Sequence, residues 1–151
     1  MEIKIGIQSV IEDMKNKSHL ETSSIETEKR YQVELGTEKL PEVYLDIESA
    51  KSELQTVISP FLEDMYHTYG DDELHTPQDM TLEFKMSPRR EDGKSAAMAR
   101  AIHDYLVHKA LELGYTSVNA LDLAKTHADL SSEIEGRINK LLYTKKGPKV
   151  W

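Results

Sequence analysis

The sequence predicts a mainly α-helical protein, a helical bundle built on a C-terminal antiparallel helix hairpin with one or two short β segments. Three observations lead to this fold class. Two long stretches near the C-terminus place apolar residues at helical spacing, and only residues 115–117 separate them. A third amphipathic stretch occupies the middle of the chain. Alternation of apolar and polar residues, which indicates β structure, is confined to residues 3–7 and 81–86.

The N-terminus combines a strand pattern with a helix pattern. Three isoleucines alternate with other residues over positions 3–7, which predicts a strand. Helical spacing over residues 7–17 predicts a short amphipathic helix. The two patterns overlap at Ile7, so the boundary between them stays open.

A second helix is expected over residues 25–35. Ser23 and Glu26 have the spacing of a capping box at its start. Gly36 is placed to stop the helix in a left-handed conformation.

The central apolar stripe covers residues 43–69 and contains Pro60. Proline removes a backbone donor and clashes with the preceding turn, so either one helix kinks at Pro60 or two helices meet there. Because the stripe keeps its phase beyond the proline, we expect a single kinked helix.

Residues 81–86 alternate with a period of two, which predicts a short strand with Leu82, Phe84 and Met86 on one side. The obvious pairing partner within the chain is the segment 3–7. Without that partner, the strand edge has to be covered or paired by another molecule. These three side chains are therefore candidate partner-binding residues.

The C-terminal hairpin follows. Its first helix is expected from about residue 93 to 113, with Gly114 as the left-handed cap. The second begins at Thr116 or Ser117 and continues to about residue 143. The expected buried positions are Met98, Ile102, Tyr105, Leu106, Ala110 and Leu113 on the first helix, and Leu121, Ala124, Ala128, Ile134, Ile138 and Leu141 on the second.

We expect one helical domain over residues 1–144, which suits the length of 151 residues. Within it, residues of about 1–40 form an N-terminal arm and residues of about 43–144 the helical core. Residues 145–151 form a basic C-terminal tail, because Gly147 and Pro148 end the helix.

Composition excludes several classes of function. The chain has 19 basic and 27 acidic residues, a net charge of −8, and no cysteine. The missing cysteines exclude a disulfide framework, thiolate catalysis and cysteine-based zinc sites. The negative charge argues against non-specific binding to nucleic acid or to an anionic membrane. No apolar stretch is long enough to cross a bilayer, and the N-terminus lacks the apolar run of a signal peptide.

The charge is divided unevenly along the chain. Residues 1–80 carry eleven more acids than bases, and residues 81–151 carry three more bases than acids. One interpretation is a set of solvated faces that keep the domain soluble. The other is charge complementarity between neighbouring subunits or partners, and a head-to-tail contact of that kind makes rings or stacks.

No catalytic residue, cofactor or metal is expected. His103 and His108 are five residues apart, so they diverge around a helix and cannot share a metal. No Gly-x-Ser-x-Gly elbow is present. A metal-dependent enzyme is the third hypothesis, and its metal would lie among His67, Asp71, Asp72 and His75.

Arg89 and Arg90 follow the predicted strand and are further candidate contact residues. One interpretation is contact with phosphate or a DNA backbone, but the chain has too few basic residues for strong binding of that kind. Pairing with the acids of residues 71–79 is the alternative.

The C-terminal tail ends in the only tryptophan of the chain, Trp151. Tryptophan is a favoured anchor in protein contacts, so the tail is a candidate for reaching a neighbour. Folding back onto its own helices is the alternative. The basic candidate residues beside Trp151 are Lys145, Lys146 and Lys149.

Three stretches carry a family resemblance: KSHLETSSIETEKRYQVELGTEKL (17–40), LEFKMSPRREDGKSAAMARAIHDYLVHKALELGY (82–115) and GRINKLLYTKKGPKVW (136–151). Together they resemble an uncharacterised family of proteins encoded in prophages of Bacteroides-type bacteria near virion structural genes. Size and helix order are also similar to the small helical head-tail connector (adaptor) proteins of tailed phages, which form rings at the portal vertex. The resemblance implies a structural role and transfers no functional residue.

Residues and resemblance together predict a non-enzymatic virion structural protein, a head-tail connector or neck component of a tailed phage or prophage that assembles through protein–protein contacts. Its expected partners are further copies in a ring and other virion proteins such as a portal, with no membrane and at most weak contact with a nucleic-acid backbone. The protein is expected in the cytoplasm when made and in the virion afterwards. The alternative is a small cytoplasmic regulatory or protein-binding helical module.

Overall fold

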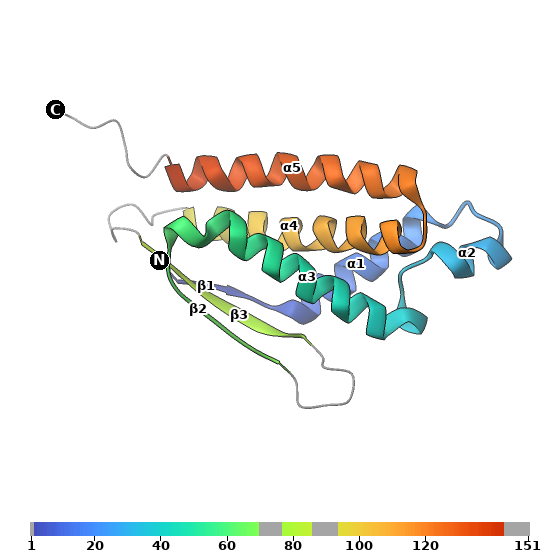
Figure 1. Ribbon diagram of the computed structural model, residues 1–151, viewed down its shortest axis with the longest axis horizontal. Helices are drawn as coiled ribbons and strands as arrows, with labels where there is room; N and C mark the ends of the chain where they lie inside the picture. Colours follow the sequence, from blue (N-terminus) through green and yellow to red (C-terminus); the bar gives the residue numbers. More distant parts are fainter. Residues whose placement is uncertain (1, 70–76, 86–93, 144–151) are drawn as a thin grey trace.

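The structure is a computed structural model, and it describes residues 2–69, 77–85 and 94–143 (Figure 1). In chain order the elements are β1 (Glu2–Ile5), α1 (Ile7–Glu21), α2 (Thr27–Val33), the 3₁₀ turn η1 (Thr37–Lys39), α3 (Leu40–Ile58), the 3₁₀ turn η2 (Ser59–Phe61), β2 (Leu62–Tyr69), β3 (Pro77–Phe84), α4 (Lys94–Ser117) and α5 (Leu121–Tyr143).

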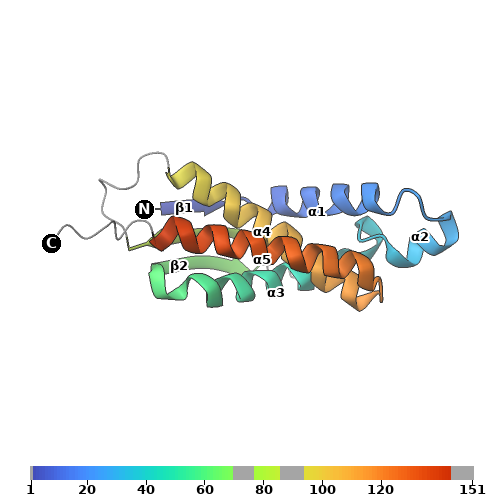
Figure 2. The ribbon, with the colours of Figure 1, turned by 90° about the horizontal axis from the view of Figure 1, so that it is seen from above.

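The elements are arranged around α4. α5 covers one side of this helix, and α3, α1 and β1 lie on its other side (Figures 1 and 2). Ile102, Leu106 and Ala110 of α4 have no exposed surface. The mainly α fold class and the C-terminal helix hairpin that the sequence predicts are therefore confirmed.

The three strands form one antiparallel sheet in the order β1-β3-β2. Ile3 is opposite Leu82 and Ile5 is opposite Met80, so the predicted pairing between the N-terminal segment and the later strand is confirmed. β2 pairs with the other edge of β3. β3 is therefore the central strand of the sheet.

The central helix is shorter than predicted. α3 ends at Ile58, η2 carries the chain through Pro60, and residues 62–69 form β2 instead of the second half of a kinked helix. Proline disfavours continuation of the helix, and the residues after it find their backbone partners in β3. The apolar stripe does not reveal this second cause, because the partner strand comes later in the chain.

β1 and α1 are part of the core. Ile5, Ile7 and Met14 are buried in the same apolar cluster as the side chains of α3 and α4. The amide of Ile7 donates to Asp79 Oδ1 at 2.9 Å, which fixes the start of α1 on β3. The prediction of an N-terminal arm is therefore wrong for these two elements.

The predicted capping box is absent from α2. The helix begins at Thr27 without a side-chain cap, and Gly36 precedes η1 instead of ending α2. Ser23 Oγ donates to the carbonyl of Leu20 at 2.7 Å. The backbone amide of Ser23 donates to the same carbonyl at 3.3 Å, so Ser23 belongs to the end of α1 instead of starting the next helix.

Gly114 does not end α4, as the sequence pattern predicts, because the helix continues to Ser117. The left-handed residue of the following turn is Asn119, with φ 61°. A Cβ at position 114 would lie 2.5 Å from Leu35 Cδ1 and 3.0 Å from Asp46 Oδ2. A glycine is therefore needed at this position because the Leu35 side chain packs closely against the helix backbone. No pattern in the neighbouring sequence predicts this contact.

We expect Gly114→Ala to destabilise the protein by about 1–3 kcal/mol, the usual cost of adding a methyl group to a filled core. Gly136→Ala is the matched control, because a Cβ there meets nothing within 4 Å and alanine is the better helix former by about 1 kcal/mol. Urea unfolding measures both effects. Leu35→Ala combined with Gly114→Ala should lose less than the sum of the two single variants, and strict additivity would contradict the proposed clash.

Candidate functional site

The structure buries two of the predicted partner-binding residues. Leu82 and Phe84 are fully buried, and both edges of β3 are paired. The prediction that this strand offers a binding edge is therefore wrong, because β2 covers the edge that β1 leaves open.

The remaining predicted contact residues and the candidate metal ligands fall mostly outside the described residues. For His67 only the backbone, in β2, is described. The residues outside are Met86, Arg89, Arg90, Lys145, Lys146, Lys149 and Trp151, together with Asp71, Asp72 and His75.

A buried polar network joins α1, α4 and α5. Its centre is the carboxylate of Glu21, whose Oε2 lies 2.7 Å from His127 Nε2 and whose Oε1 accepts the hydroxyl of Tyr115 at 3.0 Å. His127 is 1% exposed, and its Nδ1 lies 2.9 Å from Nδ1 of His108. The two imidazole rings stack with their centroids 5.1 Å apart, and the Tyr115 ring stacks on His127 at 5.7 Å.

Donors and acceptors match along the whole network when one hydrogen lies between the two Nδ1 atoms. A carboxylate only accepts, so His127 donates to it through Nε2, and the Nδ1 atoms of His127 and His108 share one hydrogen bond. Tyr115 also donates to the carboxylate, so its oxygen accepts the hydroxyl of Ser18, 3.0 Å away. Ser18 Oγ in turn accepts the amide of Leu35 at 2.7 Å. One chain of hydrogen bonds therefore runs from the Leu35 backbone to His108.

The surroundings set the charges in this network. Burial raises the pKa of Glu21, but the hydrogen bond and charge of His127, with help from Tyr115 and His108, outweigh burial and hold the pKa below 4.5. Burial lowers the pKa of His108 to about 4, and the charges of His127 and Lys17 act in the same direction. Glu21 is therefore an anion at neutral pH, and His108 is uncharged.

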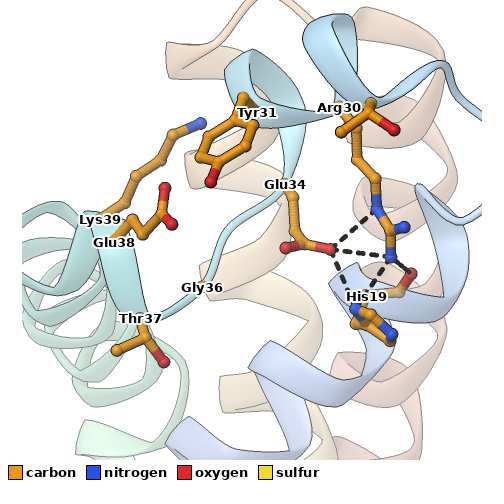
Figure 3. A pocket seen from close by; sticks show the side chains of 9 residues that line it. His19, Arg30, Tyr31, Glu34, Gly36, Thr37, Glu38 and Lys39 are labelled. Atoms are coloured by element: carbon orange, nitrogen blue, oxygen red, sulfur yellow. Dashed lines mark hydrogen bonds and ion pairs between the residues drawn. The ribbon is translucent and has the colours of Figure 1, made fainter.

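The network links Glu21 of α1 to His108 of α4 through His127 of α5. None of its side chains lines the cavity of Figure 3. Its arrangement therefore connects three helices and offers no place for a substrate at that cavity.

The sequence does not predict this network, because the histidine nearest to His108 on the same helix, His103, is not its partner. His103 instead lies 2.5 Å (Nε2) from Asp13 Oδ2, and the partner of His108 comes from α5. One signal was available. His127 and Ser131 continue the buried stripe of α5 that Ala124 begins, and a polar residue on a core face needs a buried partner.

A cavity of about 340 Å³ opens between α2 and η1 (Figure 3). Tyr31 of α2 and Lys39 of η1 line it. Glu34 points toward the side that is formed by His19 and Arg30, and its Oε1 lies 3.1 Å from both His19 Nδ1 and Arg30 Nε. The lining therefore carries charges of both signs.

The large exposed apolar side chains of the described residues come from one end of the molecule. Leu20 (71% exposed) lies near the end of α1, Tyr31 (62%) in α2, Leu45 (69%) in the second turn of α3, and Leu121 (60%) at the start of α5. These segments lie at the end that carries α2 in both views (Figures 1 and 2). Leu121, predicted to face the core, therefore belongs to this apolar end.

No protein-family model, curated protein or solved structure matches the chain. Among the described residues, no helix is long and apolar enough to cross a membrane. Within the same residues, no three side chains of His, Asp or Glu come together as a metal site. The candidate sites are therefore the buried network, the cavity and the apolar end.

Asp46 of α3 generates a prediction about pH. Burial, with the charge of Glu42, raises its pKa from 3.8 to about 7. A raised native pKa means that stability is highest below the ordinary pKa and is lost as the pH rises through about 7. Asp46→Asn should therefore raise the melting temperature at about pH 8 and change it little near pH 4. The exposed Asp129→Asn is the matched control, and equal shifts for both variants at every pH would contradict the assignment.

Proposed function

We propose that the protein is a non-enzymatic structural protein that assembles head to tail, as a head-tail connector or neck component of a tailed phage or prophage. One observation carries the proposal. The exposed large apolar side chains of the described residues belong to one end of the molecule, whereas α5 ends with Tyr143 at the other end (Figures 1 and 2), and residues 145–151 come soon after it in the sequence. Exposed apolar patches mark contact sites, and Trp151 is a favoured anchor for them.

We infer that the contact is made with a neighbour. α5 has 23 residues, so about 34 Å of helix separates Tyr143 from the apolar end. Trp151 comes eight residues after Tyr143, and even a fully extended segment of that length reaches only about 26–29 Å. A contact between one end of a molecule and the opposite end of the next is heterologous, and such contacts build rings or stacks.

The charges of the two ends are complementary. Residues 26–46, which contain α2 and the start of α3, hold six acids and three bases, and Glu38 and Glu42 among them are exposed. The tail supplies the opposite charge from three lysines between residues 145 and 149. Complementary charge steers encounter and fixes register, which suits an assembly contact.

The resemblance to connector proteins supports a place in the virion, with further copies and a portal as partners. The cavity between α2 and η1 favours the second candidate function, a small cytoplasmic regulatory or protein-binding module. A cavity of this size suits a small ligand or a single side chain of a partner.

Light scattering tests the head-to-tail contact. The purified protein should have a molar mass above the 17.2 kDa of one chain, rising with concentration. Deletion of residues 145–151 should give a monomer, and so should Tyr31→Ser with Leu45→Ser, because each change removes one half of the contact. A mixture of the two variants should form a dimer and nothing larger, since one tail and one apolar end remain intact.

Gln55→Ser, an exposed position in the last turn of α3, is the control and should assemble like the wild type. A two-fold dimer that is unchanged by deletion of the tail would overturn the head-to-tail contact, and so would a wild-type chain that stays monomeric. The virion assignment has a separate test in the flanking genes. Neighbours that include no portal, capsid or tail gene would contradict it.

A further inference from the structure

Residues 22–39, which lead from α1 to α3, are attached to the rest of the described structure by few contacts. Among their apolar side chains only Leu35 is fully buried, and α2 makes sparse contacts with the other helices and strands. Segments that bury little apolar surface open locally at low cost. We call residues 22–39 the strap.

Leu35 makes the first attachment of the strap. Its side chain occupies the space beside Gly114 where a Cβ would otherwise stand, and its amide donates to Ser18 Oγ at 2.7 Å. Ser18 is fully buried and also contacts the hydroxyl of Tyr115. The backbone of the strap is therefore joined directly to the polar network around Glu21.

The carboxylate of Glu34 makes the second attachment (Figure 3). Its Oε1 accepts from Arg30 Nε at 3.1 Å and from the hydroxyl of Thr22 at 3.3 Å, and it lies 3.1 Å from His19 Nδ1 of α1. Arg30 Nη2 also donates to the carbonyl of His19 at 3.1 Å. Charge and hydrogen bonding therefore hold this part of the strap against the end of α1.

We propose that acidification releases the strap, residues 22–39, while the sheet and the helices α3, α4 and α5 stay folded. Both attachments depend on carboxylates that accept hydrogen bonds. A protonated Glu21 no longer attracts His127 and Tyr115 as an anion, so the hydrogen-bond chain that ends at the Leu35 amide weakens.

The two histidines act in the same direction. His108 and His127 share one hydrogen between their Nδ1 atoms, so a pair that is protonated on both atoms has to separate. His108 faces Lys17 and Glu21 of α1, His127 of α5, and Asp104 of its own helix; burial and the cations outweigh the acids and lower its pKa to about 4. A lowered pKa gives stability that is present above the unfolded value and is lost as the pH falls through about 4.

The helices α3, α4 and α5 have a second attachment that does not titrate. The His108–His127 contact joins α4 to α5, but apolar contacts also hold α4 against α5, α3 and β1, so these helices stay packed when the histidine pair separates. The low native pKa of Glu21, which its partners hold below 4.5, places the loss of its charge in the same acid range. We therefore expect the strap to open at a pH at which α3, α4 and α5 are still folded. The proposal does not depend on the proposed function.

Hydrogen exchange measured by mass spectrometry on the full chain tests the release, at about pH 7 and about pH 4 with labelling times corrected for the intrinsic rate. Relative to amides of α4, amides of the strap should exchange about tenfold faster at the lower pH. Ser18→Ala should release the strap at neutral pH with α4 still protected. His108→Asn keeps an N–H donor near the Nδ1 position without a titrating ring, so release should move to lower pH.

Ser52→Ala is the matched control, because Ser52 is an exposed serine of α3 whose hydroxyl donates to the carbonyl of Glu48. In this variant, the amides of the strap should exchange at the same rates as in the wild type at both pH values. Loss of protection in the strap and in α4 at the same pH would overturn the proposal, as would equal protection of the strap at both pH values. Should Ser18→Ala fail to fold, the wild-type profile and His108→Asn decide the question, and an unchanged pH of release in His108→Asn excludes the histidine pair from the mechanism.

Discussion

The fold depends on the burial of α4. Ten of its residues are buried, and α5, α3, α1 and β1 all contact it. Burial of a large apolar side chain contributes roughly 1.5–3 kcal/mol, whereas one hydrogen bond contributes a net of about 1 kcal/mol. The apolar surface of α4 therefore decides that the chain collapses around this helix. Gly114 extends the same principle, because the missing side chain lets Leu35 reach the helix backbone.

Polar contacts decide how the outer elements are attached to that core. The amide of Ile7 is held by Asp79, and the buried ammonium of Lys51 lies 3.3 Å from both Glu48 Oε1 and the carbonyl of Gln78, so α1 and α3 are both tied to β3. A buried polar group without a partner is costly, so each such contact excludes alternative registers. The Glu21 network has the same role between α1 and the hairpin.

Sequence patterns predict those parts of the fold that depend on local periodicity. The helices α4 and α5 and the alternation at residues 81–84 are of this kind, and even the pairing of β1 with β3 follows from two alternating segments. β2 was missed because its strand partner lies later in the chain. Gly114 was misread because the side chain that fills its place comes from residue 35, and the histidine pair was missed because its members lie on different helices. In each case the deciding contact joins residues that no local window contains.

The apolar end and the strap overlap in one residue, which links the two proposals. Tyr31 is exposed on α2 and therefore belongs to the strap, whereas Leu20, Leu45 and Leu121 come from α1, α3 and α5. Release of the strap would remove Tyr31 from the apolar end and leave the other three side chains in place. A neighbour that binds this end through all four would then lose part of its contact without any change in the core. If both proposals hold, assembly weakens on acidification before the protein unfolds, because the attachments of the strap titrate and the apolar contacts of α4 do not.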